Sequence, residues 1–133
     1  MTFKQLCAEL EISMQEGYEP GVTLERAERL ASRFLTAMLQ TSTELTGADL
    51  DSRMRKTGVK TIRAAVYLDC ATKGEKKPTE AALAAMVDLD KTVIEEQNAY
   101  DQAEVSKAEL QRYYDIFREA QLTFRGISKG KYE

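Results

Sequence analysis

The chain has 133 residues and a mass of 15.0 kDa, which fits one domain of ordinary size. Nineteen Lys and Arg against 22 Asp and Glu give a formal net charge of −3, so a chain that is basic throughout, of the histone or protamine kind, is excluded. The sequence has no His, the commonest general base and zinc ligand, and no glycine-rich phosphate loop. We therefore predict a protein that is not an enzyme and that binds no cofactor or metal.

The cysteines and the apolar runs indicate the compartment. Cys7 and Cys70 form no CxxC pair, and the first ten residues resemble the start of an amphipathic helix rather than a secretory signal. No run approaches the roughly 18 apolar residues that a membrane span needs. We expect a cytoplasmic protein without a membrane partner.

Helical periodicity extends along most of the chain, so we predict an all-α fold, a helical bundle in a single domain over 1–133. We expect an N-terminal helical pair over 1–48, a basic third helix and loop over 49–78, and a long helix with a basic tail over 79–133. The first helix is predicted from an apolar stripe that ends at a turn over 16–21; its residues are Phe3, Leu6, Cys7, Leu10 and Met14.

Thr23 is a suitable N-cap for the second helix, whose apolar stripe comprises Leu24, Ala27, Leu30, Ala31, Phe34, Leu35 and Met38. This helix is expected to end within 41–47, a stretch of weak helix formers that closes on a glycine. Asp49 is then expected to cap the third helix, which runs to about Lys73.

Residues 80–125 contain neither Gly nor Pro and follow Thr79, a second good N-cap. Two outcomes are open for this stretch. Either the helix breaks near 98–106 and folds back as a hairpin, or it stays continuous and its overhanging part packs on another chain. We favour the long helix and expect a homo-oligomer, because no turn residue marks a break.

Charge is distributed unevenly between the three parts. Residues 1–48 carry a net charge of −3, residues 49–78 carry +4 and residues 79–133 carry −4. At about 100° per residue, four cations of the middle part form one ridge on the third helix: Arg53, Lys56, Lys60 and Arg63. The ridge has no acidic partners at i,i+4 in this interpretation, so its charge is free for an anionic ligand.

The ridge predicts a nucleic-acid surface, because spaced cations can follow a phosphate backbone and an aromatic ring can stack on a base. Its expected residues are Arg53, Lys56, Lys60, Arg63, Tyr67, Lys73, Lys76 and Lys77. The opposite side of the same helix is expected to dock on the bundle through Leu50, Met54, Gly58, Ile62, Ala65 and Val66.

Other interpretations of the ridge stay open. It could be an ordinary solvated face, it could bind RNA instead of DNA, or it could meet an acidic stretch of another copy that comprises Glu95, Glu96, Asp101 and Glu104. The chain is expected to leave the last helix at Gly126, and three cations of the tail are auxiliary candidates for nucleic-acid contact: Arg125, Lys129 and Lys131.

The order of several stretches resembles the UvsY-type recombination mediators of tailed phages. These are the Lys/Arg-rich stretch 59–69 (VKTIRAAVYLD), then 88–93 (DLDKTV), the aromatic stretch 112–117 (RYYDIF), and 124–127 (FRGI). The resemblance covers mainly residues 53–127, although this chain has no Trp and is acidic overall.

This resemblance implies an accessory protein that binds single-stranded DNA without sequence preference and oligomerises into a ring. It also implies that the protein helps to load a RecA-like recombinase by displacing the single-strand-binding protein, in the host cytoplasm if the chain is phage-encoded. The DNA contacts of the family map to Lys60 and Arg63, with Tyr67 following.

A second hypothesis comes from another class: a helical phage protein that binds another protein, such as an inhibitor of a host factor or a virion assembly component. Its expected signature is an aromatic stretch that is exposed in the free chain and buried in the complex, made of Tyr113, Tyr114 and Phe117.

Overall fold

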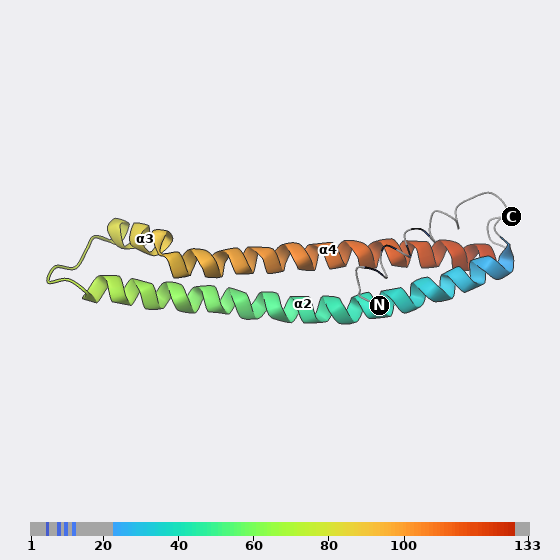
Figure 1. Cartoon of the computed structure of the whole chain (residues 1–133), viewed down its shortest axis with the longest axis horizontal. Helices are drawn as coiled ribbons and strands as arrows, with labels where there is room; N and C mark the ends of the chain where they lie inside the picture. The colour runs from blue at the N-terminus through green and yellow to red at the C-terminus, as the bar shows by residue number, and fades with distance from the viewer. Residues whose placement is uncertain (1–4, 6–7, 9, 11, 13–22, 130–133) are drawn as a thin grey trace. The chain divides into compact units, whose positions relative to one another are not determined.

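The structure is a computed structural model that describes Gln5, Ala8, Leu10, Ile12 and residues 23–129. These residues contain three long or medium helices, α2 (Leu24–Thr72), α3 (Glu80–Leu89) and α4 (Lys91–Ser128), and no strand (Figure 1). The predicted all-α class is therefore confirmed. The turn expected over 16–21 and most of the predicted first helix lie outside the described residues.

The start of α2 is capped as predicted. The backbone N–H of Arg26 donates to Thr23 Oγ1 over 3.1 Å, and the N–H of Ala27 donates to the Thr23 carbonyl over 2.9 Å. A threonine side chain thereby satisfies one of the backbone donors that a helix leaves free in its first turn.

The break expected within 41–47 is wrong, because α2 continues through this stretch to Thr72. The threonines there donate their hydroxyls to carbonyls four residues earlier, Thr41 to Ala37 over 2.7 Å and Thr43 to Leu39 over 3.1 Å, so their polar groups are satisfied inside the helix. Thr41 is also fully buried. Gly47 lowers the stability of the helix by about 1 kcal/mol relative to alanine, which is small beside the free energy that a helix of 49 residues gains from tertiary packing.

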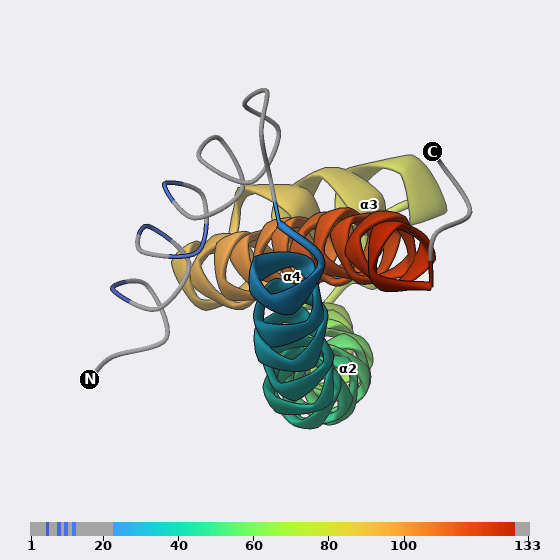
Figure 2. The same cartoon turned by 90° about the vertical axis from the view of Figure 1, so that its right-hand side faces the viewer.

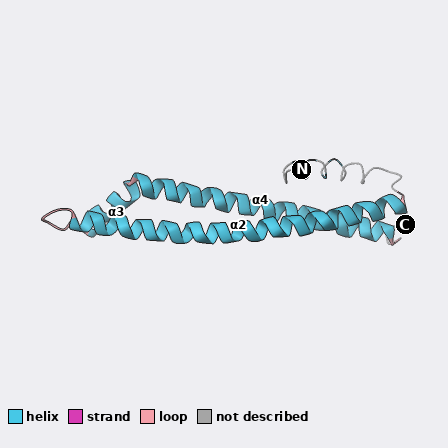
Figure 3. Cartoon of the chain, turned by 60° about the horizontal axis from the view of Figure 1, so that its bottom comes forward, coloured by secondary structure: helices cyan, strands magenta, loops and turns pink. Residues whose placement is uncertain are grey.

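The long C-terminal stretch does break, at Asp90 and not near 98–106. Asp90 Oδ1 accepts hydrogen bonds from the N–H groups of Thr92 (2.9 Å) and Val93 (3.1 Å), and also from the Thr92 hydroxyl. Asp90 has extended dihedral angles, so α3 ends there and α4 begins in a new direction (Figures 2 and 3). An aspartate at an N-cap achieves this turn without Gly or Pro.

The chain folds into two compact units, and each combines parts of both long helices. Unit 1 is Met1–Leu45 with Glu109–Glu133, and unit 2 is Thr46–Ala108. In both units the α4 segment packs on an α2 segment of the same chain. α2, which is about twice as long as a break at 41–47 would have allowed, thus covers one side of α4 within the chain.

Unit 1 has an aromatic core. The rings of Phe34 and Phe124 stack at 5.8 Å, and Phe117 lies 6.0 Å from Phe34; all three side chains are fully buried, as is Leu10. The predicted stripe of the second helix is confirmed at Ala27, Leu30, Ala31 and Phe34, whereas Leu24 and Leu35 are exposed.

Unit 2 has a thinner core of aliphatic residues: Val59, Leu83, Val87, Val93 and Ala103. Polar contacts between α2 and α4 supplement it. The buried hydroxyl of Ser52 donates to Glu104, and Lys107 Nζ lies 2.9 Å from Asp49 Oδ1. Asp49 comes before Ser52 on α2, whereas its partner Lys107 comes after Glu104 on α4. The two segments therefore run antiparallel in this unit.

Candidate nucleic-acid interface

The predicted site residues lie on the α2 segment of unit 2 and in the loop that joins it to α3. Their helix does not dock by the side that we expected. Ser52 and Val59 are buried against α4, whereas Leu50 and Met54 are 60% and 65% exposed. Ile62 and Val66 are half-buried, since they border the docked side. The polar contacts of Asp49 and Ser52 with α4 draw the helix onto this face, which lies between the cation ridge and the predicted apolar side.

Arg53 stands at the first turn of the ridge and pairs with a carboxylate of its own helix. Its Nη2 lies 3.1 Å from Asp49 Oδ2, and the Arg53 side chain is 77% exposed. The hydrogen bond from Lys107 of α4 lowers the pKa of the same Asp49 carboxyl below its ordinary value, and Arg53 contributes in the same direction. That hydrogen bond also raises the pKa of Lys107. Asp49 is therefore shared between a ridge cation and α4.

Arg63 and Tyr67 connect α2 to α3. Arg63 Nη2 donates to Asp88 Oδ1 over 2.8 Å, and the Tyr67 hydroxyl lies 3.1 Å from both carboxylate oxygens of Glu80. Both side chains are half-buried. Their position gives them a structural role in holding α3 against α2, beside any role in ligand binding.

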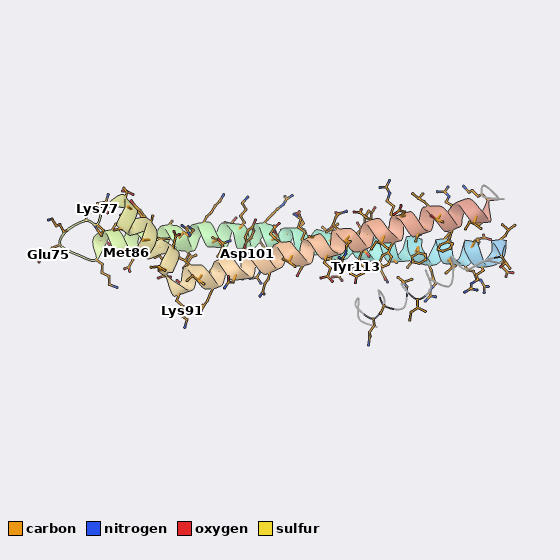
Figure 4. All side chains as sticks on the ribbon, turned by 90° about the horizontal axis from the view of Figure 1, so that it is seen from above. Glu75, Lys77, Met86, Lys91, Asp101 and Tyr113 are labelled. Atoms are coloured by element: carbon orange, nitrogen blue, oxygen red, sulfur yellow. The ribbon has the colours of Figure 1, made fainter. Side chains whose placement is uncertain are left out.

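The cations of the loop are exposed. Lys73 Nζ lies 3.9 Å from Asp69, and Lys77 Nζ lies 3.8 Å from Glu80. Figure 4 labels Lys77 and Glu75 at this end of unit 2. Within the part of the chain that the structure describes, three of the predicted cations have no ion-pair partner: Lys56, Lys60 and Lys76.

The expectation that no acid lies at i,i+4 from a ridge residue is wrong for Arg53, because Asp49 precedes it by four positions. This partner was visible in the sequence. The partners of Arg63 and Tyr67 were not, since Asp88 and Glu80 lie 25 and 13 positions away and meet α2 only because α3 folds back on it. The predicted ridge also omitted Arg55, which is paired with Asp51 over 3.1 Å.

The acidic stretch on α4 is only partly available to a neighbour. Glu95 and Glu96 are exposed, and Asp101 accepts a hydrogen bond from Gln97 over 3.0 Å. Glu104 instead accepts from Ser52 inside unit 2. This stretch therefore presents fewer free carboxylates than the sequence indicated.

The tail cations belong to unit 1. Arg125 lies in the last turn of α4 and Lys129 directly follows the helix; both are exposed, and Lys131 lies outside the described residues. The chain does not leave the helix at Gly126, because α4 continues to Ser128 and Gly126 is buried.

Among residues 23–129 and the four described positions before them, no group of three or more Cys, Asp or Glu side chains has the arrangement of a metal site. In the same residues no helix combines the length and the apolar character of a membrane span. Cys70, half-buried on α2, is a free thiol.

Comparisons with known proteins returned no match: no family model fits the chain, and neither a curated protein nor a solved structure is detectably similar to it.

Proposed function

We propose that this protein binds single-stranded DNA without sequence preference, as an accessory factor in phage recombination or replication. The observation that carries the proposal is a set of exposed lysines, Lys56 and Lys60 on α2 and Lys76 in the loop that follows it, that have no carboxylate partner among the described residues. They lie in residues 49–78, which carry a positive net charge, whereas residues 1–48 and 79–133 are each negative in total.

Lys56 and Lys60 are one helical turn apart, about 6 Å along the axis, so two phosphates of one strand can reach them together. Lysine ammonium groups bind phosphate as point charges and make no demand on base identity. Unpaired cations also release no internal partner when they bind, so their whole phosphate contact contributes to affinity.

The paired cations can add to this surface. Arg53 and Lys73 are 77% and 79% exposed, and exposed ion pairs contribute only about 0 to 1 kcal/mol. A phosphate can therefore replace Asp49 or Asp69 at little cost. Arg63 is less available, since it holds α3 through Asp88, and the stacking predicted for Tyr67 competes with its bond to Glu80.

The resemblance of 59–69 and 112–117 to UvsY-type mediators supports the remaining part of the proposal. In this function the protein oligomerises, so that the cation ridges of several subunits contact the same DNA strand. It also helps a RecA-like recombinase to replace a single-strand-binding protein. Affinity that arises from summed phosphate contacts rises steeply with subunit number and falls with salt.

The test is a fluorescence-anisotropy titration of a labelled oligonucleotide at several salt concentrations, with the double variant Lys56→Ala, Lys60→Ala. Each lost phosphate contact to a single strand reduces the slope of log K against log salt by about 0.7, so we expect weaker binding and a slope flatter by about 1.4. Arg63 is left unchanged in this variant, because its removal would also break the ion pair with Asp88 that holds α3.

The matched control is Arg29→Ala with Arg118→Ala, which removes two exposed cations from unit 1 and leaves the net charge the same as in the test variant. If the two double variants weaken DNA binding equally, the loss reflects the change in net charge and not a contact made by the ridge. Undetectable binding of the unmodified protein at low salt would end the proposal.

The second candidate function is that of a helical protein that binds another protein. The exposed aromatic surface that we expected for it is not present in the structure. Phe117 is fully buried, and Tyr113 and Tyr114 are half-buried, so the aromatic stretch is already covered within unit 1. A pull-down with and without nuclease separates the two candidates, because a complex carried by DNA is lost after nuclease treatment.

A further inference from the structure

One face of α2 in unit 2 carries an apolar heptad pattern that no other part of the described chain covers. Its residues, which we call the α2 seam, are separated alternately by four and three positions: Leu50, Met54, Thr57, Thr61, Ala64 and Leu68. All six are exposed, and the three largest are Leu50 at 60%, Met54 at 65% and Leu68 at 61%. Alternating spacings of four and three are the pattern by which one helix packs along another.

The helix that could have covered this seam lies elsewhere. α4 packs on the side of α2 that carries Ser52 and Val59, and this side is separate from the seam. Beside the seam runs a shallow groove of about 440 Å³ whose lining is mostly apolar and small: Met54, Thr57, Gly58, Thr61, Ile62 and Ala65, with Glu96 of α4. The groove provides room for a second helix against the seam.

The two threonines of the seam do not oppose burial. The hydroxyl of Thr57 donates to the Arg53 carbonyl over 3.2 Å, and that of Thr61 donates to the Thr57 carbonyl over 3.0 Å. A partner that covers them therefore leaves no hydroxyl donor unsatisfied. Together with Gly58 and Ala64 they keep the middle of the seam narrow, which allows a helix to approach closely.

The charges along the seam select its partner. One edge is basic, because Arg53 and Lys60 directly precede Met54 and Thr61. The other edge carries Glu96, a carboxylate oxygen of which lies 3.5 Å from the position of a Cβ built on Gly58, and Asp51, which is paired with Arg55 of the same helix. The carboxylate left on this edge is that of Glu96, and a helix with acid on both edges would meet it with like charge. The complementary helix has one acidic and one basic edge.

We propose that the α2 seam binds the same seam of a second copy of this chain, with the two α2 helices parallel. In a parallel pair the basic edge of each helix faces the acidic edge of the other, so Arg53 faces Glu96 of the second copy. An antiparallel pair would oppose basic to basic and acidic to acidic edges, which is unfavourable. This self-association surface lies on α2 and not on the C-terminal helix, and it does not depend on DNA binding.

Cysteine cross-linking without nucleic acid tests both the surface and the orientation. In a background of Cys7→Ser with Cys70→Ser, Leu50→Cys and Leu68→Cys are made singly and oxidised, and covalent dimers are measured by non-reducing electrophoresis. A parallel seam joins each variant to itself. Dimers that form only when the two variants are mixed would show an antiparallel pair, and this would overturn the proposal.

Val105→Cys is the matched control, because Val105 is 67% exposed on α4 and lies outside the seam. If Val105→Cys cross-links as much as the seam variants, the covalent dimers arise from random collision and the proposal is wrong. A monomer in light scattering at tens of micromolar protein would also overturn the proposal. Met54→Glu is expected to weaken association by about tenfold or more, since it buries an unpaired carboxylate. Circular dichroism checks that each variant stays helical.

A charge exchange gives a second readout that does not depend on packing. Arg53→Glu should weaken association several-fold, and adding Glu96→Arg should restore it, because the pair is then reversed across the interface. Failure of the double variant to recover would contradict the parallel arrangement. DNA titration of Met54→Glu, which changes a seam residue outside the cation ridge, separates the two proposals: loss of self-association with DNA binding kept would contradict only the summing of several ridges on one strand.

Discussion

Unit 1 and unit 2 are built from the same two helices but are stabilised differently. Unit 1 buries three phenylalanines, of which Phe34 contacts both Phe117 and Phe124, with Leu10, Leu30 and three alanines around them. Unit 2 buries smaller aliphatic side chains and relies on polar contacts between its helices, such as Ser52 with Glu104. Every side-chain N or O atom that is buried in the described residues of the two units has a hydrogen-bond partner.

The two units therefore differ in how much their buried side chains stabilise the fold and in which side chains they expose. A fully buried aromatic side chain contributes far more than an exposed ion pair, so unit 1 carries most of the stabilisation that the described chain supplies itself. Unit 2 keeps both its unpaired lysines and its α2 seam on the surface. The unit with the thinner core is thus the one that carries the unpaired lysines of α2 and the exposed α2 seam.

The largest expected effect is on the aromatic core. Phe124→Ala should lower the free energy of unfolding by about 3–5 kcal/mol, because it removes a buried ring and leaves a cavity beside Phe34. The matched change in unit 2, Val93→Ala, removes fewer buried atoms and should cost less. Urea unfolding followed by circular dichroism measures both, and the opposite ranking would contradict the contrast between the units.

A smaller effect tests whether α2 is continuous where the two units join in the sequence. Gly47→Ala should stabilise the protein by about 0.5–1 kcal/mol, because alanine is the better helix former and nothing lies within 4 Å of the added Cβ. A helix end at Gly47 would give the reverse result, since a glycine that terminates a helix often needs dihedral angles that alanine resists. Thermal unfolding distinguishes the two signs.

The smallest expected effect concerns pH. Since the pKa of Asp49 is lowered in the folded protein, its contribution to stability is complete above the ordinary aspartate pKa of about 3.9 and is lost as the pH falls through the lowered value. Asp49→Asn should therefore reduce the stability difference between pH 6 and pH 3, measured as the shift of the urea midpoint. Asp51→Asn, whose arginine partner lies on the same helix, is the control.

Local patterns predicted the caps and much of the apolar stripe. Thr23 and Thr79 cap their helices as expected, the latter by accepting from the N–H of Ala82 over 3.2 Å. These features depend on residues within one turn, which the sequence displays directly. The break at Asp90 was not predicted, although aspartate is one of the favoured N-cap residues. The break expected within 41–47 failed because weak propensity yields to tertiary packing.

The candidate site divides in the same way. Its cations and their positive segment are a matter of composition and helical angle, so residues 53–63 were placed on one ridge from the sequence. Which of them are free was decided by elements far along the chain. Arg63 pairs with Asp88 only because α3 folds back on α2. Lys56 and Lys60 stay unpaired because no acid of α3 or α4 comes within ion-pair distance of them.

The sequence by itself determined that this protein is helical, where two of its caps lie, and that a positive segment sits inside an acidic chain, because periodicity, capping and charge are properties of neighbouring residues. Only the tertiary structure decided which face of α2 meets α4. On that helix the sequence offered a ridge of cations and an apolar side, and α4 packs on the face between them, where Ser52, Val59 and Asp49 find their partners. As a result Lys56 and Lys60 of the ridge and Leu50 and Met54 of the apolar side stay exposed, whereas Arg63 and Ile62 are half-buried.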